Sequence, residues 1–509
     1  MSTTAARPEA PATIDPEPTT PTEPPEPTGS TERSLAWITT PGLVLGLVSA
    51  LYGLGRTSLW LDESYSLGAV HQLGRTLRET SGTMGGYYVV LRAWTTVSES
   101  AWWMRSLSVV AAGLALVVVG RVAQRLQGAR IARLTVLLTA LSYLWLVYAR
   151  EARSYGMVML LTAVSWLALD HALAAPDDRA RRRWWLAHSA LATALPLFHG
   201  LSALQVLPHA GAVAAAGGDR RTWTRLARGL VGSLVVTGAL LSVGAGKVGD
   251  WVTPLSPDLV WTAFRLLTNP IPLFTLACVG LLGWSTVGQA RAARATAAGL
   301  ARARTIAPVL WALAPLVLLV GLSVVRPSLV PRYLIGSTPG LALLMATGLD
   351  RITRPDLRRL AIVGLVAILA TGHLDVHAPA VDGWERATTV VADEARPGDG
   401  LLLVGEADRP PFEAEWRDRD NPDLALVGSD RPLGTVLRFE DDDLSPAARR
   451  TRAASTDRIW VVGDTVFGTF DTTVDALVDG TPGSPATHRE VARWAEDGVA
   501  VEVVLLERR

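Results

Sequence analysis

Two adjacent carboxylates, Asp62 and Glu63, follow the first apolar stretch of the chain within the segment LWLDESYS. The apolar and aromatic residues beside them, Trp60, Leu61 and Tyr65, would bring this segment back to a membrane surface. Two neighbouring negative charges near such a low-dielectric boundary increase the proton affinity of at least one carboxylate. Since a general base has to accept a proton near neutral pH, the pair is a candidate for acid–base catalysis. The structural alternative is a solvated turn or a helix cap.

Arginines and tyrosines in two later connectors form a second candidate group. In YAREARSYG (148–156) the polar side chains are those of Arg150, Glu151, Arg153 and Tyr155. In PRYL they are those of Arg332 and Tyr333. A guanidinium group presents a planar fork of donors that fits phosphate oxygens, so these residues are candidate ligands of a lipid phosphate. A structural ion pair, for instance between Glu151 and Arg153, is the alternative.

Two further residues are candidates for an acceptor-side or a structural role, as is Glu151. His199 lies in a turn between two apolar runs, where it is either a packing residue or a group that reaches a substrate. Tyr87 belongs to the mixed segment GGYYVVLRAW. These residues extend the candidate site beyond the carboxylates and arginines.

No metal or cofactor site is predicted. The only cysteine, Cys278, lies inside an apolar run, which excludes sites built on several cysteines and any internal disulfide. The connectors between the apolar runs contain no Asp-x-Asp motif and no histidine cluster. A divalent cation could share the neutralisation of a phosphate, but nothing in these connectors calls for one.

The composition places these residues in a membrane protein. Hydrophobic residues make up 49% of the 509 residues, and the mean hydropathy is +0.27, which is too apolar for a pair of ordinary soluble domains. Eleven apolar runs alternate with charged connectors. They cover residues 35–54, 106–120, 134–148, 156–173, 184–198, 200–217, 229–246, 271–288, 306–325, 334–349 and 360–372.

The predicted fold class is therefore an α-helical polytopic membrane protein with about eleven transmembrane helices. Several runs are shorter than the roughly 20 residues that cross the hydrocarbon core, but interfacial tryptophans and snorkelling arginines can extend them. The long connector 55–105 is too polar to span the membrane. It is predicted to form short helices that lie in the interface.

Every second connector contains four arginines. The five clusters are Arg121, Arg125, Arg130, Arg133; Arg179, Arg181, Arg182, Arg183; Arg220, Arg221, Arg225, Arg228; Arg291, Arg294, Arg302, Arg304; and Arg351, Arg354, Arg358, Arg359. The positive-inside rule places all five in the cytoplasm. The N-terminus is then cytoplasmic, the C-terminus lies outside the cell membrane, and Asp62, Arg153 and Arg332 share the outer face.

The two ends of the chain differ from its apolar middle, residues 34–372. Residues 1–33 are rich in Pro, Thr and Glu and should form a disordered cytoplasmic tail. Residues 373–509 contain 15 Arg and 28 Asp or Glu, a net charge of −13, which leaves +14 on residues 1–372 because the whole chain carries +1. This segregation suits a basic part in the membrane and an acidic, solvated domain, and no nucleic-acid motif accompanies it.

Residues 373–509 are predicted to form a small extracytoplasmic α/β domain. DGWERATTVVADEA has helical periodicity, and LLLVG, RIWVVG and VAVEVVLLE are buried-strand runs. REVARWAEDG is predicted to be a helix before the last strand.

Several of these segments, taken in order, resemble the family-39-type glycosyltransferases of the GT-C fold, a group that includes mannosyltransferases dependent on dolichyl or polyprenyl phosphate. The matching segments are LWLDESYS, GGYYVVLRAW, YAREARSYG, LFHGLSALQVLPH, PRYL and DGWERA followed by RPGD, and they cover most of residues 35–405. The sequence departs from the usual pattern at TMGGYY, where relatives often have His-Pro-Pro, or an Asp with a His, before the Tyr pair.

This resemblance implies a function for residues 34–372. The family's enzymes transfer a sugar from a polyprenyl-phosphate carrier to a protein, lipid or polysaccharide hydroxyl outside the cytoplasmic membrane. Asp62 would be the catalytic base with Glu63 beside it, and Arg153 and Arg332 would bind the carrier phosphate. The alternatives are a transporter or flippase of lipid-linked components, and a non-catalytic receptor or scaffold. Transporters usually place charges and broken helices at mid-membrane, whereas here the polar groups lie at helix ends.

Overall fold

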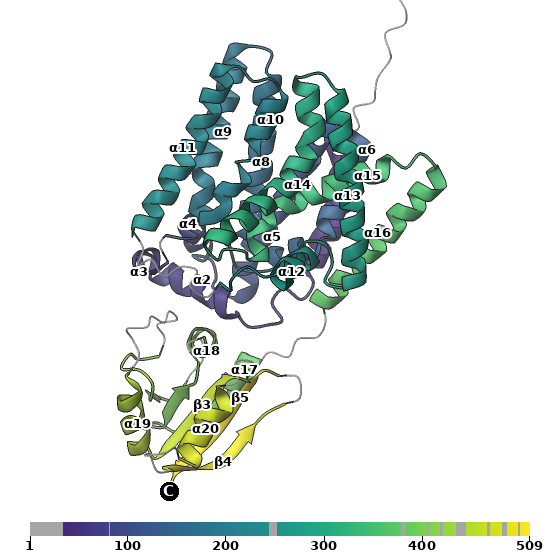
Figure 1. Ribbon diagram of the computed structural model, residues 1–509. Helices are drawn as coiled ribbons and strands as arrows, with labels where there is room; N and C mark the ends of the chain where they lie inside the picture. Colours follow the sequence, from purple (N-terminus) through teal and green to yellow (C-terminus); the bar gives the residue numbers. More distant parts are fainter. Residues whose placement is uncertain are drawn as a thin grey trace, which may run out of the picture. The chain divides into compact units, whose positions relative to one another are not determined.

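The protein is a helical membrane protein with a small C-terminal α/β domain, as predicted (Figure 1). The computed structural model describes residues 34–80, 82–243, 252–377, 383–405, 407–417, 421–433, 444–465, 469–480, 486–496 and 499–509. The N-terminal tail predicted for residues 1–33 lies outside the described residues.

Six helices of the described chain are long and apolar enough to cross a membrane. They are α5 (Ala101–Gln127), α8 (Tyr155–Ala174), α11 (Arg220–Val243), α13 (Pro272–Ala295), α14 (Leu300–Val325) and α16 (Pro355–Val376). A seventh candidate span consists of α6 (Ala129–Ala140) and α7 (Tyr143–Ala149), which meet at an angle of 60°. Helix α16 continues past the domain boundary expected at His373.

The remaining predicted spans coincide with shorter or more polar helices. These are α1 (Leu35–Leu51), α9 (Asp178–Phe198), η1 (Gly200–Gln205) with α10 (His209–Ala215), and η2 (Pro331–Ser337) with α15 (Thr338–Asp350). Length and composition thus identify six or seven spans in the described chain rather than eleven. Two of these four runs are divided into a 3-10 turn and a short helix by breaks at residues such as Pro208. Helix α1 has only 17 residues, and α9 begins with the charged segment DRARRR.

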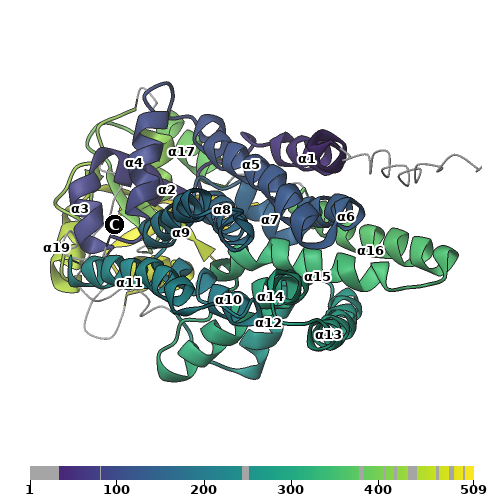
Figure 2. The same ribbon diagram turned by 90° about the horizontal axis from the view of Figure 1, so that it is seen from above.

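Large apolar side chains on the outside of the bundle mark a surface for lipid. Val325 of α14 is 86% exposed and Leu234 of α11 is 64% exposed. Water would disfavour such a surface, whereas hydrocarbon does not. Helix α15, in contrast, is buried from Thr338 to Leu349 and contacts α6, α13 and α14, which surround it (Figure 2).

Close helix contacts and one buried ion cluster fix the bundle. A Cβ atom at Gly340 of α15 would lie 2.6 Å from the backbone nitrogen of Ala312 on α14, so only glycine permits this approach. At another point, Asp170 of α8 accepts from Arg125 of α5 at 2.5 Å and from Arg304 of α14 at 2.7 Å. This cluster joins three helices that are distant in sequence.

The predicted short helices of residues 55–105 are present as α2 (Leu61–His71), α3 (Leu73–Glu79) and α4 (Gly85–Trp94). A further short helix, α12 (Pro257–Thr268), follows α11 in the described chain. None of these four reaches spanning length. Helix α2 places Asp62 and Glu63 in its first turn, where carboxylates are favoured by the helix dipole.

The C-terminal domain is a five-stranded sheet with helices on both faces. Its elements are α17 (Gly383–Glu394), β1 (Gly400–Leu403), α18 (Arg409–Trp416), β2 (Ala425–Leu426), α19 (Pro446–Ser455), β3 (Arg458–Asp464), α20 (Phe470–Val478), β4 (His488–Trp494) and β5 (Val501–Arg508). The strand order is β2-β1-β3-β5-β4, with β1 parallel to β2 and β3, and β5 antiparallel to β3 and β4. Helices α17 and α18 pack on one face, and α19 and α20 on the other.

The prediction of a helix for REVARWAEDG was wrong, because residues 488–494 form the edge strand β4. Glu490 and Arg493 are three residues apart, a spacing that is typical of an ion pair on a helix. A register shift between Glu490 and Ala492 brings both side chains to the same face of the strand, where they pair at 3.2 Å. The other predicted elements of this domain, one helix and three strands, are confirmed as α17, β1, β3 and β5.

Candidate active site

Glu63 is completely buried in an ion pair with Arg105 of α5. Arg105 Nε donates to Oε1 at 2.8 Å and its terminal nitrogen donates to Oε2 at 2.6 Å, while the Ala152 backbone N–H donates to Oε1 at 2.7 Å. The same guanidinium also donates to backbone carbonyls of the loop before α2, including that of Leu54. Both oxygens of Glu63 are therefore engaged in holding this loop, α5 and the loop after α7 together.

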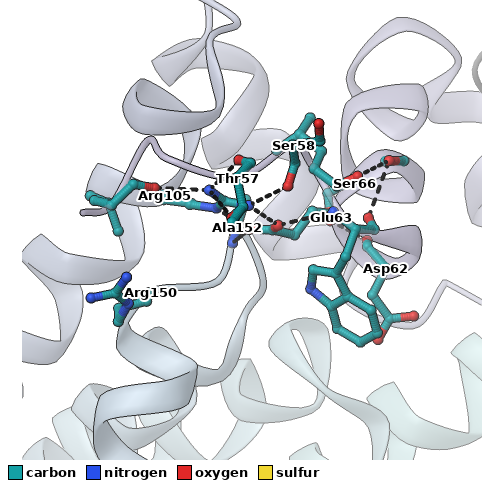
Figure 3. Close-up of polar contacts among 12 residues, drawn as sticks. Thr57, Ser58, Asp62, Glu63, Ser66, Arg105, Arg150 and Ala152 are labelled. Atoms are coloured by element: carbon teal, nitrogen blue, oxygen red, sulfur yellow. Dashed lines mark hydrogen bonds and ion pairs between the residues drawn. The ribbon is translucent and has the colours of Figure 1, made fainter. Parts of the chain in front are cut away.

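Asp62 points away from this pair, as Figure 3 shows. Successive side chains on a helix diverge by about 100°, so two adjacent carboxylates on α2 enter different environments. Asp62 Oδ2 lies 3.6 Å from a terminal nitrogen of Arg153 and 3.5 Å from one of Arg332. These distances exceed those of a hydrogen bond, and this buried oxygen has no hydrogen-bond partner. The Asp62 carboxylate is thus attracted electrostatically by two cations, but its Oδ2 atom is not hydrogen-bonded to either.

The two arginines reach Asp62 from different parts of the chain. Arg153 follows α7 and donates to the backbone carbonyl of Asp62 at 3.1 Å and to the hydroxyl of Tyr88 at 3.3 Å. Arg332 comes from η2. Burial by itself would lower the pKa of each guanidinium, but the negative charge of Asp62 and the surrounding tyrosines outweigh it and raise the pKa of both. Both side chains are therefore permanent cations.

Three aromatic side chains, those of Tyr155, His199 and Tyr333, lie near the two arginines. The ring of His199 lies 4.3 Å from that of Tyr333 and 5.9 Å from that of Tyr155, measured between centroids. Burial, together with the positive charges of Arg153 and Arg332, lowers the pKa of His199 to about 3. His199 is therefore neutral at physiological pH and contributes a hydrogen-bonding group rather than a charge.

Glu151 lies in the same loop as Arg153, with its Oε2 atom buried and without a hydrogen-bond partner. Burial, followed by the negative charges of Glu63 and Asp62, raises the pKa of Glu151 well above its ordinary value. The expected pairing of Glu151 with Arg153 is not among the ion pairs of the described chain, since Arg153 pairs with Asp62. The protonated form of Glu151 is therefore favoured relative to an exposed glutamate.

Two candidates form no hydrogen bond or ion pair with Asp62 in the described chain, although Tyr87 interacts electrostatically with Arg153. Arg150 donates to the carbonyl of Tyr52 at 2.6 Å and to Nδ1 of His377 at 3.2 Å, so it belongs to the ends of α1 and α16. Tyr87 of α4 is fully buried, with its ring 5.9 Å from that of Tyr88, and burial raises the pKa of its hydroxyl.

Two participants were absent from the residues selected by sequence. Arg105 lies near the start of an apolar helix. The only feature of the sequence that marks it is its position at a helix end that the positive-inside rule assigns to the outer face, where arginines are less common. Tyr88 differs from its neighbour Tyr87 only in its orientation on α4. Among the described residues, no group of three or more His, Cys, Asp or Glu could hold a metal ion.

Comparison with known proteins places this site in a known fold. No protein-family model matches the sequence, and no curated protein matches it significantly. ArnT from Cupriavidus metallidurans in the apo state is similar in structure, with a TM-score of 0.61 and 18% identity over 92% of this chain and 98% of that chain.

Two more solved structures extend this similarity. ArnT from the same organism bound to undecaprenyl phosphate gives a TM-score of 0.60 at 17% identity, over 93% of this chain and 98% of that one. The Archaeoglobus fulgidus oligosaccharyltransferase in complex with Zn and sulfate gives 0.52 at 12% identity, over 87% and 70%. The chain therefore has the GT-C fold of membrane glycosyltransferases.

Proposed function

We propose that the protein is an inverting glycosyltransferase that moves a sugar, mannose or another hexose or pentose, from a polyprenyl-phosphate carrier to a hydroxyl group. The acceptor would be a glycan, lipid or protein of the cell envelope. The observation that carries this proposal is the position of Asp62, a half-buried carboxylate whose Oδ2 atom faces two arginines without accepting a hydrogen bond from either. The structural similarity to ArnT bound to undecaprenyl phosphate supports the choice of carrier.

The chemistry assigns one role to each side of this cluster. Asp62 takes the proton of the acceptor hydroxyl, whose oxygen attacks the anomeric carbon opposite the carrier phosphate. The bond from that carbon to the phosphate oxygen breaks, and the electron pair leaves with the phosphate. Arg153 and Arg332 stabilise the negative charge that develops there, so no general acid is needed. A single displacement of this kind inverts the anomeric configuration.

Binding of the carrier phosphate would make Asp62 available as a base. A carrier phosphate bound by Arg153 and Arg332 competes with Asp62 for their donors, and the present contacts of 3.5–3.6 Å are weak enough to exchange. Glu63, whose oxygens are both occupied, then acts as a positioning residue that fixes the first turn of α2. Tyr155 and Tyr333 form the aromatic wall beside the phosphate.

We place this reaction on the outer face of the cell membrane. The five arginine clusters would lie in the cytoplasm with the N-terminus, and the acidic domain after α16 would lie outside with Asp62. The hydroxyl acceptor would then belong to the envelope rather than to a cytoplasmic molecule.

Transfer by the Asp62→Asn variant tests the proposal. Asparagine keeps the shape of the side chain but has no basic oxygen, so transfer from a labelled polyprenyl-phosphate sugar should fall by about two to four orders of magnitude. Asp258→Asn, an exposed carboxylate on α12, is the matched control and should leave transfer unchanged. Full activity of Asp62→Asn would remove the catalytic assignment. A product that retains the donor's anomeric configuration would exclude the single displacement.

A further inference from the structure

A polar cavity of about 790 Å³ is lined in part by the Glu63–Arg105 pair. Its principal lining residues come from the end of α1, the loop before α2, the end of α7 and the end of α16: Tyr52, Arg56, Trp60, Arg150, Glu151 and His377. Asp62, Arg153 and Arg332 do not line it. In Figure 3 Arg150 lies apart from Asp62, on the opposite side of the view. This cavity, called here the α1–α16 pocket, is therefore distinct from the proposed transfer site.

The α1–α16 pocket has an excess of positive charge. Of its three arginines, Arg105 is neutralised by Glu63, whereas no carboxylate of the described chain forms an ion pair with Arg56 or Arg150. The Arg56 guanidinium lies 4.7 Å from the centroid of the Tyr52 ring. Burial and the positive charges of Arg105 and Arg56 lower the pKa of Arg150. Cations that repel one another in this way are stabilised by a bound anion.

The other titratable groups of the pocket do not cancel this charge. Arg150 donates to Nδ1 of His377, so the ring proton of His377 is on Nε2, which lies 3.0 Å from the hydroxyl of Ser49. Burial and the charge of Arg150 lower the pKa of His377, which is consistent with a neutral ring. Burial and the charges of Glu63 and Asp62 raise the pKa of Glu151 well above its ordinary value, which disfavours a negative charge on this side chain. Arg56 and Arg150 thus contribute two positive charges that no carboxylate of the described chain pairs.

We propose that the α1–α16 pocket binds the phosphate group of a ligand at the membrane surface, with Arg56 and Arg150 as its cationic partners. Two guanidinium groups match phosphate oxygens, and the volume accommodates a headgroup rather than a bare ion. Tyr52 and Trp60, which are 55% and 39% exposed, have the amphipathic character of residues at a membrane interface. This binding function goes beyond the transfer reaction and does not depend on it.

Binding measurements on the purified full-length protein in an uncharged detergent test the proposal. The probes are dioctanoyl phosphatidylglycerol, which presents a phosphate on a lipid, and glycerol 1-phosphate, which presents it in solution. Native mass spectrometry counts the bound molecules, and titration gives the dissociation constant. We expect saturable binding of at least one probe. Binding of the lipid alone identifies a lipid headgroup, and equal binding of both identifies a soluble phosphate compound.

Variants then locate the site. Arg56→Gln should weaken binding by about tenfold or more, which corresponds to roughly 1.4 kcal/mol, and Arg56→Lys should retain most of the affinity because it keeps the charge. Arg150 also donates to carbonyls at the end of α1, so it is replaced conservatively, as Arg150→Lys. This variant keeps the charge but loses the planar guanidinium group with its several donors, and it should bind phosphate more weakly. Arg92→Gln, an exposed arginine on α4, removes the same charge elsewhere.

Two results would overturn the assignment. The first is the absence of saturable binding for both probes. The second is an equal loss of affinity in Arg56→Gln and Arg92→Gln, since that would show a general effect of net charge. Transfer activity is measured separately, so a failure of the α1–α16 pocket leaves the test of Asp62 unaffected.

Discussion

Replacing Glu63 with Gln should destabilise the fold rather than only remove a proton acceptor. Glu63 accepts two hydrogen bonds from the Arg105 guanidinium and one from the Ala152 backbone, and its side chain is 1% exposed. A Gln side chain keeps the length and one acceptor oxygen. Its amide group, however, would place N–H donors against the donors of Arg105.

The expected cost follows from the burial of both partners. The side chain of Arg105 is 6% exposed, so the substitution leaves a buried positive charge without its counter-charge. Removing one partner of a buried ion pair typically costs about 3–5 kcal/mol. Because Gln retains one oxygen and Arg105 keeps its bonds to backbone carbonyls, we expect a loss of about 3 kcal/mol in the free energy of unfolding.

A double-mutant cycle measures this coupling. The free energy of unfolding of the purified protein is compared for Glu63→Gln, Arg105→Gln and the combination of the two. Each single variant should lose stability, and the combination should lose less than the sum, because neither charge is then left alone. Asp62→Asn is the matched control on the same helix turn, and it should change stability much less than Glu63→Gln.

The opposite pattern would refute this reasoning. If Glu63→Gln unfolds like the unmodified protein and nevertheless loses transfer activity to the same extent as Asp62→Asn, Glu63 takes part in the chemistry. Additive losses in the cycle would show that Glu63 and Arg105 do not stabilise each other.

Three further predictions concern the phosphate side of the site, its pH dependence and the topology. Arg153→Ala and Arg332→Ala should each weaken donor binding by roughly 1.5–3 kcal/mol while acceptor affinity changes less, and unchanged donor affinity in both would leave them as structural residues. Burial lowers the pKa of His199 to about 3 in the native state, whereas the pKa of histidine in an unfolded chain is about 6.5. As the pH falls below about 6.5, the unfolded state therefore binds a proton that the native state does not bind, and the native state loses stability. The loss amounts to about 2 kcal/mol of unfolding free energy between pH 7 and pH 5. The unfolding free energy of His199→Asn should therefore depend less on pH than that of the unmodified protein. An equal pH dependence of the two would contradict the lowered pKa of His199. In a Cys278→Ser background, a cysteine introduced as Arg450→Cys should react with an impermeant thiol reagent on intact cells, whereas reaction only after the inner face is exposed would reverse the topology.

The membrane class and the elements of the C-terminal domain could be predicted from the sequence. Long apolar runs are excluded from water wherever they fold, so their presence alone determines the class of protein. In the C-terminal domain, LLLVG and RIWVVG are buried on both faces of a sheet, and such strands appear as continuous apolar runs. The edge strand β4 was not predicted because one of its faces is exposed and a bulge disrupts the alternation of apolar and polar residues.

The sequence also selected the residues of the Asp62 cluster, because arginines and carboxylates at helix ends are conspicuous in an apolar chain. Asp62, Arg153 and Arg332 lie far apart in sequence, and their common position at helix ends suggested that they meet. The tertiary structure brings a terminal nitrogen of each arginine within 3.6 Å of Asp62 Oδ2.

Only the tertiary structure separated the roles of neighbouring residues. Asp62 and Glu63 have similar chemistry, but the pitch of α2 directs one to two arginines and the other to Arg105, which is 42 residues away. Arg150 and Arg153 share one short loop, yet Arg150 closes the end of α1 and Arg153 reaches Asp62. Local sequence determines which charges exist, whereas the direction of each side chain and the partner that it meets depend on helices packed from distant parts of the chain.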